Sequence, residues 1–166
     1  MNMDWVILQR LLIAAALSGL IGFEREHRGK RAGLRTHMLV AVGSALFVSF
    51  VGLFVISSQA LAPGGSPGNF RIQIEPLAVV EAIVSGISFL GAGTIFVSGQ
   101  QNRVHGLTTA ASIWVTAAIG IAVGLEHYVL AAGTTLLVLV ILHLLSVFDM
   151  PPAKERSEDP PSEASQ

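Results

Sequence analysis

Residues 37–57 read HMLVAVGSALFVSFVGLFVIS, a stretch without a single Asp, Glu, Lys or Arg. At about 1.5 Å of rise per residue, a helix of this length crosses the apolar core of a bilayer. Four further apolar stretches have similar lengths, at residues 5–23, 77–98, 108–125 and 128–148. The chain is 52% hydrophobic and only 13% charged, which leaves too little polar surface for a water-soluble globule. The sequence therefore predicts an all-α fold, a polytopic bundle of five transmembrane helices.

The basic residues predict the orientation of this bundle. Five of the ten Lys and Arg residues lie between positions 25 and 35, in the first loop, and loops rich in Lys and Arg stay on the cytoplasmic side. Alternation from this loop places the N-terminus outside and the C-terminus inside. The alternative is that residues 5–23 form a cleaved signal peptide. It fits less well, because Asp4 stands where a basic cluster is usual and Arg10 interrupts the apolar stretch.

Two regions of the chain differ in composition. Residues 1–148 form the predicted transmembrane domain, whereas residues 149–166 are rich in Pro, Ser and acidic residues. A segment of that composition buries too little apolar surface to fold, so we expect a disordered cytoplasmic tail. The chain contains no cysteine, which excludes disulfides, a thiol nucleophile and a metal site of the cysteine type.

Short motifs recur along the chain. SGL at 18–20 recurs as SGI at 85–87, and GLRT at 33–36 recurs as GLTT at 106–109. Two interpretations are open. The first two spans are a parallel duplicate of the third and fourth, as in some transporters, or these common membrane residues match by chance.

The GLRT and GLTT motifs stand at predicted cytoplasmic helix starts. Thr36, and Thr108 or Thr109, can accept a hydrogen bond from an unpaired amide of the first helical turn. The two helix starts can also hold an anion such as a lipid or nucleotide phosphate, with four basic side chains beside them: Arg31, Arg35, Arg103 and His105. The simpler alternative is helix capping together with ordinary anchoring by basic residues.

The fourth apolar stretch carries small residues at every fourth position: Thr108, Ser112, Thr116, Gly120 and Gly124. In lipid, small side chains let helix backbones approach closely, and the resulting dispersion attraction holds the helices together. We therefore expect another helix to pack against this face.

Two charged residues fall inside predicted spans, where an unpaired charge is costly. Arg10 and Glu81 lie about 7 Å and about 6 Å below the outer ends of their spans, at 1.5 Å per residue. This shared depth predicts an ion pair. The alternatives are that Arg10 extends outward while Glu81 faces water unpaired, or that Glu81 is a cation or proton site whose charge Arg10 controls. His143 is expected to be a hydrogen-bonded core histidine.

Gly91 and Gly93 lie in the sequence FLGAGT, toward the inner end of the third stretch. They can break the helix and expose carbonyl groups to a cavity, which is tolerated only where protein or water covers the backbone. Equally, they can let another helix pack closely.

Five blocks of sequence together carry a family resemblance: GFERE at 22–26, AGLRTH at 32–37, VGSA at 42–45, SGISFLGAGTI at 85–95 and GLTTAA at 106–111. In order and spacing they resemble the N-terminal membrane domain of the MgtC/SapB family. The resemblance implies a multi-pass protein of the bacterial inner membrane, in a family tied to magnesium homeostasis, growth at low magnesium and, in pathogens, survival inside macrophages. The residues that match the signature blocks are Glu24, Arg25, Gly33, Arg35, Thr36, Gly91, Gly93, Gly106, Thr108 and Thr109.

The chain also departs from the family pattern. Ala78 and Ala82 stand where Arg and Gln are common, Glu81 is additional, and His105 replaces a frequent Arg. Many relatives add a soluble ACT-like domain, whereas this sequence continues into the acidic tail. Ligand sensing by such a domain is therefore not expected here.

Two classes of function remain. The first is a regulatory membrane protein that acts through helix contacts. Transport of Mg²⁺ is less well supported, because this ion prefers an octahedron of oxygen ligands and Glu81 alone supplies too few of them. The second is a small transporter or channel for Mg²⁺ or H⁺, supported by Arg10, Glu81 and the two glycines. We expect no enzyme and no cofactor, since no nucleophile–base pair or ligand cluster is visible at readable spacing. The partners that fit are the lipid bilayer and a second copy or another membrane protein, without nucleic acid.

Overall fold

The computed structural model describes residues 3–60, 76–98 and 103–147. The helices are α1 (Met3–His27), α2 (Leu34–Ala60), α3 (Pro76–Thr94), α4 (Leu107–Gly124) and α5 (Tyr128–Val147). The first four are long and apolar enough to cross a membrane, and α5 is an apolar helix whose described side chains cover the shorter range Tyr128–Leu144. The predicted helical bundle is confirmed. The predicted tail, residues 149–166, lies outside the described residues.

A small antiparallel hairpin interrupts the helical pattern between α3 and α4. Strand β1 (Phe96–Ser98) pairs with β2 (Arg103–His105), with Phe96 opposite His105 and Val97 opposite Val104. The third apolar stretch was expected to be helical to residue 98, but its helix ends at Thr94. Apolar residues continue past this point, so the change from helix to strand leaves no break in hydropathy.

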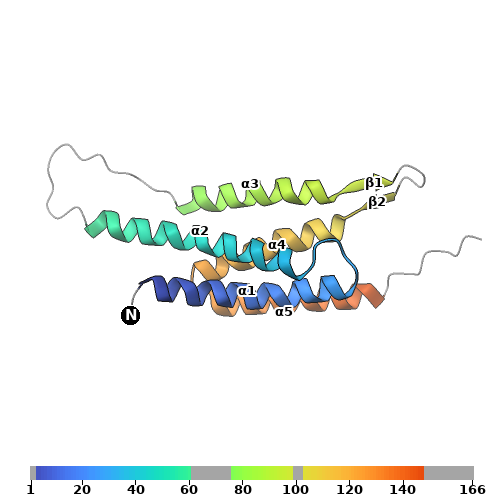
Figure 1. The fold of residues 1–166 in the computed structure, drawn as a ribbon, viewed down its shortest axis with the longest axis horizontal. Coiled ribbons are helices and arrows are strands. Elements are labelled where there is room, and N and C mark those ends of the chain that lie inside the picture. The colour runs from blue at the N-terminus through green and yellow to red at the C-terminus, as the bar shows by residue number, and fades with distance from the viewer. Residues whose placement is uncertain (1–2, 61–75, 99–102, 148–166) are drawn as a thin grey trace, which may run out of the picture.

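Successive helices run in opposite directions along the bundle (Figure 1). The 28–33 loop, the β1–β2 hairpin, the start of α4 and the end of α5 lie together, and we call this the hairpin end. The start of α1, the end of α2, the start of α3 and the α4–α5 turn lie at the opposite end. Residues from every helix therefore meet at each end, although they are far apart in sequence.

Helix α4 is the centre of the bundle, because it contacts α1, α2, α3 and α5. Helix α3 lies at the edge and contacts α4 and α2 (Figure 1). The main core is formed mostly by small and β-branched side chains from α1, α2, α4 and α5. Its buried members are Ala14, Ile21, Ala41, Ala45, Ile119, Val123 and Ala131.

The small-residue face of α4 packs against α2. A Cβ atom built on Gly120 would lie 2.4 Å from the Ala41 carbonyl oxygen, and one built on Gly124 would lie 3.0 Å from the Ala45 carbonyl oxygen. Ser112 and Thr116 are buried on the same face, whereas Thr108 is exposed. The two backbones thus meet where side chains are smallest, as helices in lipid commonly do.

Candidate functional site

The last turn of α1 carries a buried ion pair at the hairpin end. Arg25 is only 2% exposed, and its Nε and Nη2 donate to the two Glu24 carboxylate oxygens at 2.5 and 2.9 Å. Arg28, one turn later, also pairs with Glu24. A buried ion pair requires this two-point geometry, because the attraction must offset the loss of hydration. One carboxylate shared by two guanidinium groups leaves this cluster with a net positive charge.

His37, in the first turns of α2, joins this region to α4. Its side chain is completely buried, with Nδ1 2.8 Å from the Gly33 carbonyl oxygen and Nε2 3.1 Å from Ser112 Oγ. Both ring nitrogens of His37 therefore lie within hydrogen-bond distance of a polar partner. Glu24 and Arg25 both lie within electrostatic reach of His37. The polar cluster therefore ties α1, α2 and α4 together.

The approach of α1 to α2 depends on Gly22. A Cβ atom at Gly22 would lie 2.7 Å from Leu34 Cα and 3.1 Å from His37 Cβ. Any larger residue would push the start of α2 away from α1 and would separate His37 from the Glu24–Arg25 pair. Glycine at position 22 is thus required by this close approach.

Caps at the two helix starts differ from those that the sequence predicts. The Leu34 amide donates to the Glu26 carboxylate of α1 at 2.8 Å, and Thr36 is exposed. For α4, Gly106 is the N-cap residue at φ 91°, and no side chain caps this helix. The prediction of threonine caps is therefore wrong at Thr36, Thr108 and Thr109. Thr109 is buried, and its carbonyl oxygen accepts from Ser112 Oγ at 2.9 Å.

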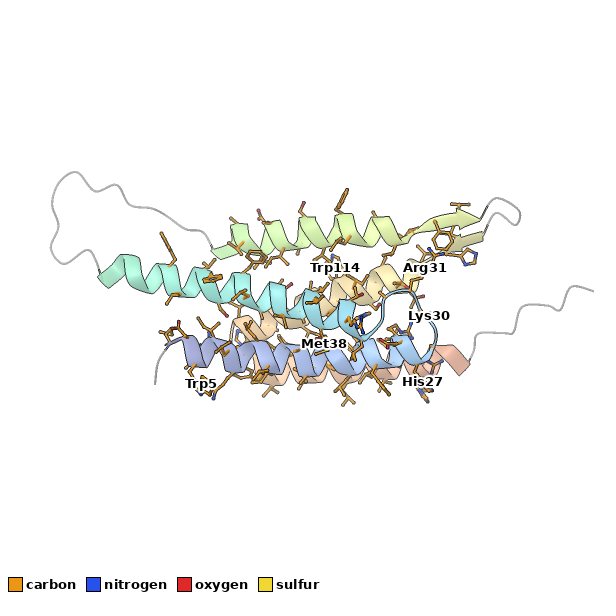
Figure 2. All side chains as sticks on the ribbon, viewed as in Figure 1. Trp5, His27, Lys30, Arg31, Met38 and Trp114 are labelled. Atoms are coloured by element: carbon orange, nitrogen blue, oxygen red, sulfur yellow. The ribbon has the colours of Figure 1, made fainter. Side chains whose placement is uncertain are left out.

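An aromatic contact joins the first loop to the hairpin. The Arg31 guanidinium carbon lies 4.0 Å from the centroid of the Phe96 ring, and His105 stacks on Phe96 with centroids 5.3 Å apart. Figure 2 shows Arg31, Lys30 and His27 together at this end of the bundle. Arg35 is also exposed here. His105, singled out from the sequence, thus contacts an aromatic ring that sequence reasoning missed.

The intramembrane charge pair was predicted with the wrong partner. Arg10 pairs with Glu126 of the α4–α5 turn, whereas Glu81 is exposed on α3 and has no ion pair among the described residues. Glu126 adopts φ 68° at a position just after a helix where glycine is usual. Equal depth in the membrane did not identify the partner, because depth does not specify which side of each helix faces inward.

The glycines of α3 do not break the helix, which is continuous from Pro76 to Thr94. A Cβ atom on Gly91 would lie 3.6 Å from Ala110 Cβ of α4, and one on Gly93 would have no neighbour within 4 Å. Close packing therefore applies to Gly91 alone.

His143 lies near the C-terminal end of α5. Its Nδ1 is 3.4 Å from Arg28 Nη2, so it extends the polar cluster of the hairpin end to a fourth helix. The expectation of a buried core position is wrong, because the residue is exposed. Neither His37 nor Arg28 was singled out from the sequence. A histidine in the first turn of an apolar span, together with a serine on the small-residue face of α4, is the signal that points to the His37–Ser112 contact.

The described residues offer little for binding a metal ion. No group of three or more His, Cys, Asp or Glu side chains within residues 3–60, 76–98 and 103–147 is placed to hold one. Glu24 is already shared by two guanidinium groups. A hydrated Mg²⁺ ion would meet positive charge at the hairpin end, because the carboxylates there are already paired or capping.

A family model described as the MgtC family matches residues 11–150. The chain belongs to the MgtC family. This confirms the resemblance carried by the five sequence blocks. The polar cluster and the close contact between α2 and α4 are therefore features of one chain of this family.

Relatives of this MgtC-family chain come from several bacteria. It is 42% identical over 149 residues to the protein named "Putative magnesium transporter YhiD" of Escherichia coli K12, covering 88% of this chain and 64% of that protein. It is 44% identical over 132 residues to Protein MgtC of Brucella abortus, covering 80% and 48%. For Protein MgtC of Salmonella typhimurium the values are 43% over 129 residues, covering 78% and 48%. The chain thus spans about half to two thirds of these relatives. No solved structure matches it.

Proposed function

We propose that this protein is a regulator in the bacterial inner membrane, linked to magnesium homeostasis, and that it acts through contacts between membrane helices. The magnesium link rests on membership of the MgtC family and on the name of the YhiD relative, which refers to magnesium transport. Regulation by helix contacts rests on the bundle itself. A single observation carries it: α4 lies against the α2 backbone at Gly120 and Ala41 in the middle of the bundle.

A transporter needs a polar route through the membrane, and the contact between α2 and α4 argues against one at this interface. A Cβ atom at Gly120 would already overlap the Ala41 carbonyl oxygen at 2.4 Å, so no ion fits between these helices. The charged residues sit at the two ends. Arg25 is paired at the hairpin end, and Arg10 is paired at the opposite end. In each pair the carboxylate is already bound to an arginine, so it is not available to a cation.

The second candidate function is transport of Mg²⁺ or H⁺, and Glu81 is the observation that favours it. This carboxylate is exposed on α3, a helix at the edge of the bundle. A charge on an apolar helix is costly in lipid and is commonly retained for function. In this alternative, α3 of one copy lines a pathway with a second copy, and Glu81 binds the ion within it.

Two measurements on the same variants separate these functions. The full chain is reconstituted in liposomes for Mg²⁺ and H⁺ flux, and it is expressed in a host whose growth at low magnesium depends on it. A regulator supports growth and gives no more flux than empty liposomes, and Glu81→Gln leaves growth unchanged. Flux above the empty control that disappears in Glu81→Gln, with growth lost in parallel, refutes the regulatory proposal and establishes transport.

The orientation follows from the charge distribution and has its own test. The hairpin end carries the exposed residues Lys30, Arg31 and Arg35, so we place it in the cytoplasm with the N-terminus outside. A reporter fused at Gly29 is expected to be cytoplasmic, and one fused at Gly65 is expected to be external. The reverse pattern would invert the bundle and would remove the basis for the inner-membrane orientation.

A further inference from the structure

The exposed surface of the hairpin end combines unpaired positive charge with an aromatic support. Lys30, Arg31 and Arg35 are exposed, and none of them has a carboxylate partner among the described residues. The nearby acidic groups are committed elsewhere, since Glu24 pairs with two arginines and Glu26 caps α2. Among the described residues, therefore, no unpaired carboxylate competes with an anion for this surface.

Stacking on Phe96 holds one of these cations in a defined position. The Arg31 guanidinium lies over the ring at 4.0 Å, which supports one face of the planar group. Its N–H donors lie in the plane of the guanidinium and make no hydrogen bond within the described residues. A planar guanidinium held in this way presents paired donors to two oxygens of one phosphate group, which the flexible ammonium of Lys30 does not.

The hairpin itself is amphipathic. This feature favours a phospholipid over a soluble phosphate as the ligand. Side chains alternate between the two faces of a strand, so Phe96 and His105 share one face while Val97 and Val104 share the other. The two valines are 61% and 50% exposed. The hairpin directly follows α3, a helix long enough to span the membrane, which places these valines at the membrane surface. A soluble phosphate offers nothing to an apolar face, whereas a phospholipid brings an acyl chain as well as a phosphate.

We infer that the Arg31–Phe96–His105 contact, with the exposed Lys30 and Arg35 at the same end of the bundle, is a binding site for the headgroup of an anionic phospholipid. The phosphate accepts hydrogen bonds from Arg31, and the exposed Val97 and Val104 on the opposite face of the hairpin contact the apolar part of the surrounding bilayer. The site joins the 28–33 loop to the α3–α4 connection, so the bound lipid holds these two segments together. The inference does not depend on whether the protein regulates or transports.

The test measures lipid retention by the full chain in detergent, using native mass spectrometry. Equal amounts of phosphatidylglycerol and phosphatidylcholine are added, and parallel samples receive inorganic phosphate or ATP as competitors. The wild type is expected to retain phosphatidylglycerol in preference. Neither soluble competitor is expected to displace it at equal concentration.

Matched variants distinguish a built site from diffuse charge. Arg31→Gln is expected to weaken phosphatidylglycerol retention about fivefold, the size of losing one basic contact with an anionic surface. Lys30→Gln removes the same charge without touching the ring, so its effect is expected to be smaller. Phe96→Leu keeps every charge and is expected to weaken retention by releasing Arg31. Replacing both Val97 and Val104 by serine is expected to weaken retention of both lipids.

Several outcomes would overturn the inference. One is equal retention of the two lipids by the wild type, and another is equal loss in Arg31→Gln and Lys30→Gln, which would indicate diffuse charge. Displacement by phosphate or ATP would make the site one for a soluble anion. If Arg31→Gln fails to fold by circular dichroism, Phe96→Leu decides the question, and unchanged lipid preference in that variant refutes the site.

Discussion

Gly120→Ala adds one methyl group at the closest approach of α4 to α2. The new carbon would lie 2.4 Å from the Ala41 carbonyl oxygen and 2.9 Å from Ala41 Cα, both backbone atoms that move only with the helix. Overpacking of this kind costs about 1–3 kcal/mol, and rigid backbone neighbours place this site at the upper end. Alanine recovers about 1 kcal/mol as the better helix former. We therefore expect a net loss of about 2 kcal/mol in the free energy of unfolding.

The other helix glycines supply graded controls for this prediction. Gly133→Ala on α5 has no neighbour within 4 Å, so it keeps the helix gain without a clash. Gly91→Ala meets Ala110 Cβ at an ordinary 3.6 Å, and Gly124→Ala meets the Ala45 carbonyl oxygen at 3.0 Å. The expected order of stability is Gly133→Ala, Gly91→Ala, Gly124→Ala and then Gly120→Ala.

The assay is reversible unfolding from mild detergent into sodium dodecyl sulfate, followed by circular dichroism. It reports the free energy of unfolding for all four variants under one condition. A Gly120→Ala protein as stable as Gly133→Ala would refute the close approach of α4 to α2. The α2–α4 interface would then no longer exclude an ion.

Two further predictions concern polar contacts at opposite ends of the bundle. Glu26→Ala removes the acceptor for the Leu34 amide and is expected to lower the free energy of unfolding by about 1 kcal/mol. Thr36→Ala is expected to leave it unchanged. Equal losses in the two variants would show that Thr36 also caps α2. Arg10→Gln and Glu126→Gln are expected to show a coupling energy of up to about 1 kcal/mol in a double-mutant cycle, since Glu126 is 61% exposed and solvent screens the pair. Arg10→Gln and Glu81→Gln are expected to be additive, and a coupling between them would contradict the pairing described above.

The number and order of the helices could be predicted because length and apolarity decide whether a segment spans a bilayer. Small residues in α4 predicted a close helix contact, but not that α2 is the partner. The hairpin could not be predicted, since Phe96 and Val97 continue an apolar run and three residues are too few to show a strand period. Strand pairing at this point is determined by tertiary contacts and not by the local sequence.

The errors in the candidate site have a common physical cause. Depth along a helix follows from residue number, whereas the direction in which a side chain points depends on how the helix is rotated by its neighbours. Arg10 and Glu81 therefore share a depth without facing each other, and Glu126 was missed because it lies in a turn outside the predicted spans. The cap of α2 comes from Glu26, a residue on another helix, so local sequence around Thr36 could not reveal it.

The central place of α4 has a consequence for how the protein is made. Helix α4 contacts all the other helices, yet it is the fourth to leave the ribosome. Until it inserts, α2 presents Ala41 and His37 to lipid instead of to Gly120 and Ser112. The nascent chain therefore lacks its central helix through three insertions, and Ala131 of α5 completes the core only after the fourth. A membrane protease that samples nascent chains would find its substrate in this interval, and delayed insertion of α4 would prolong the exposure.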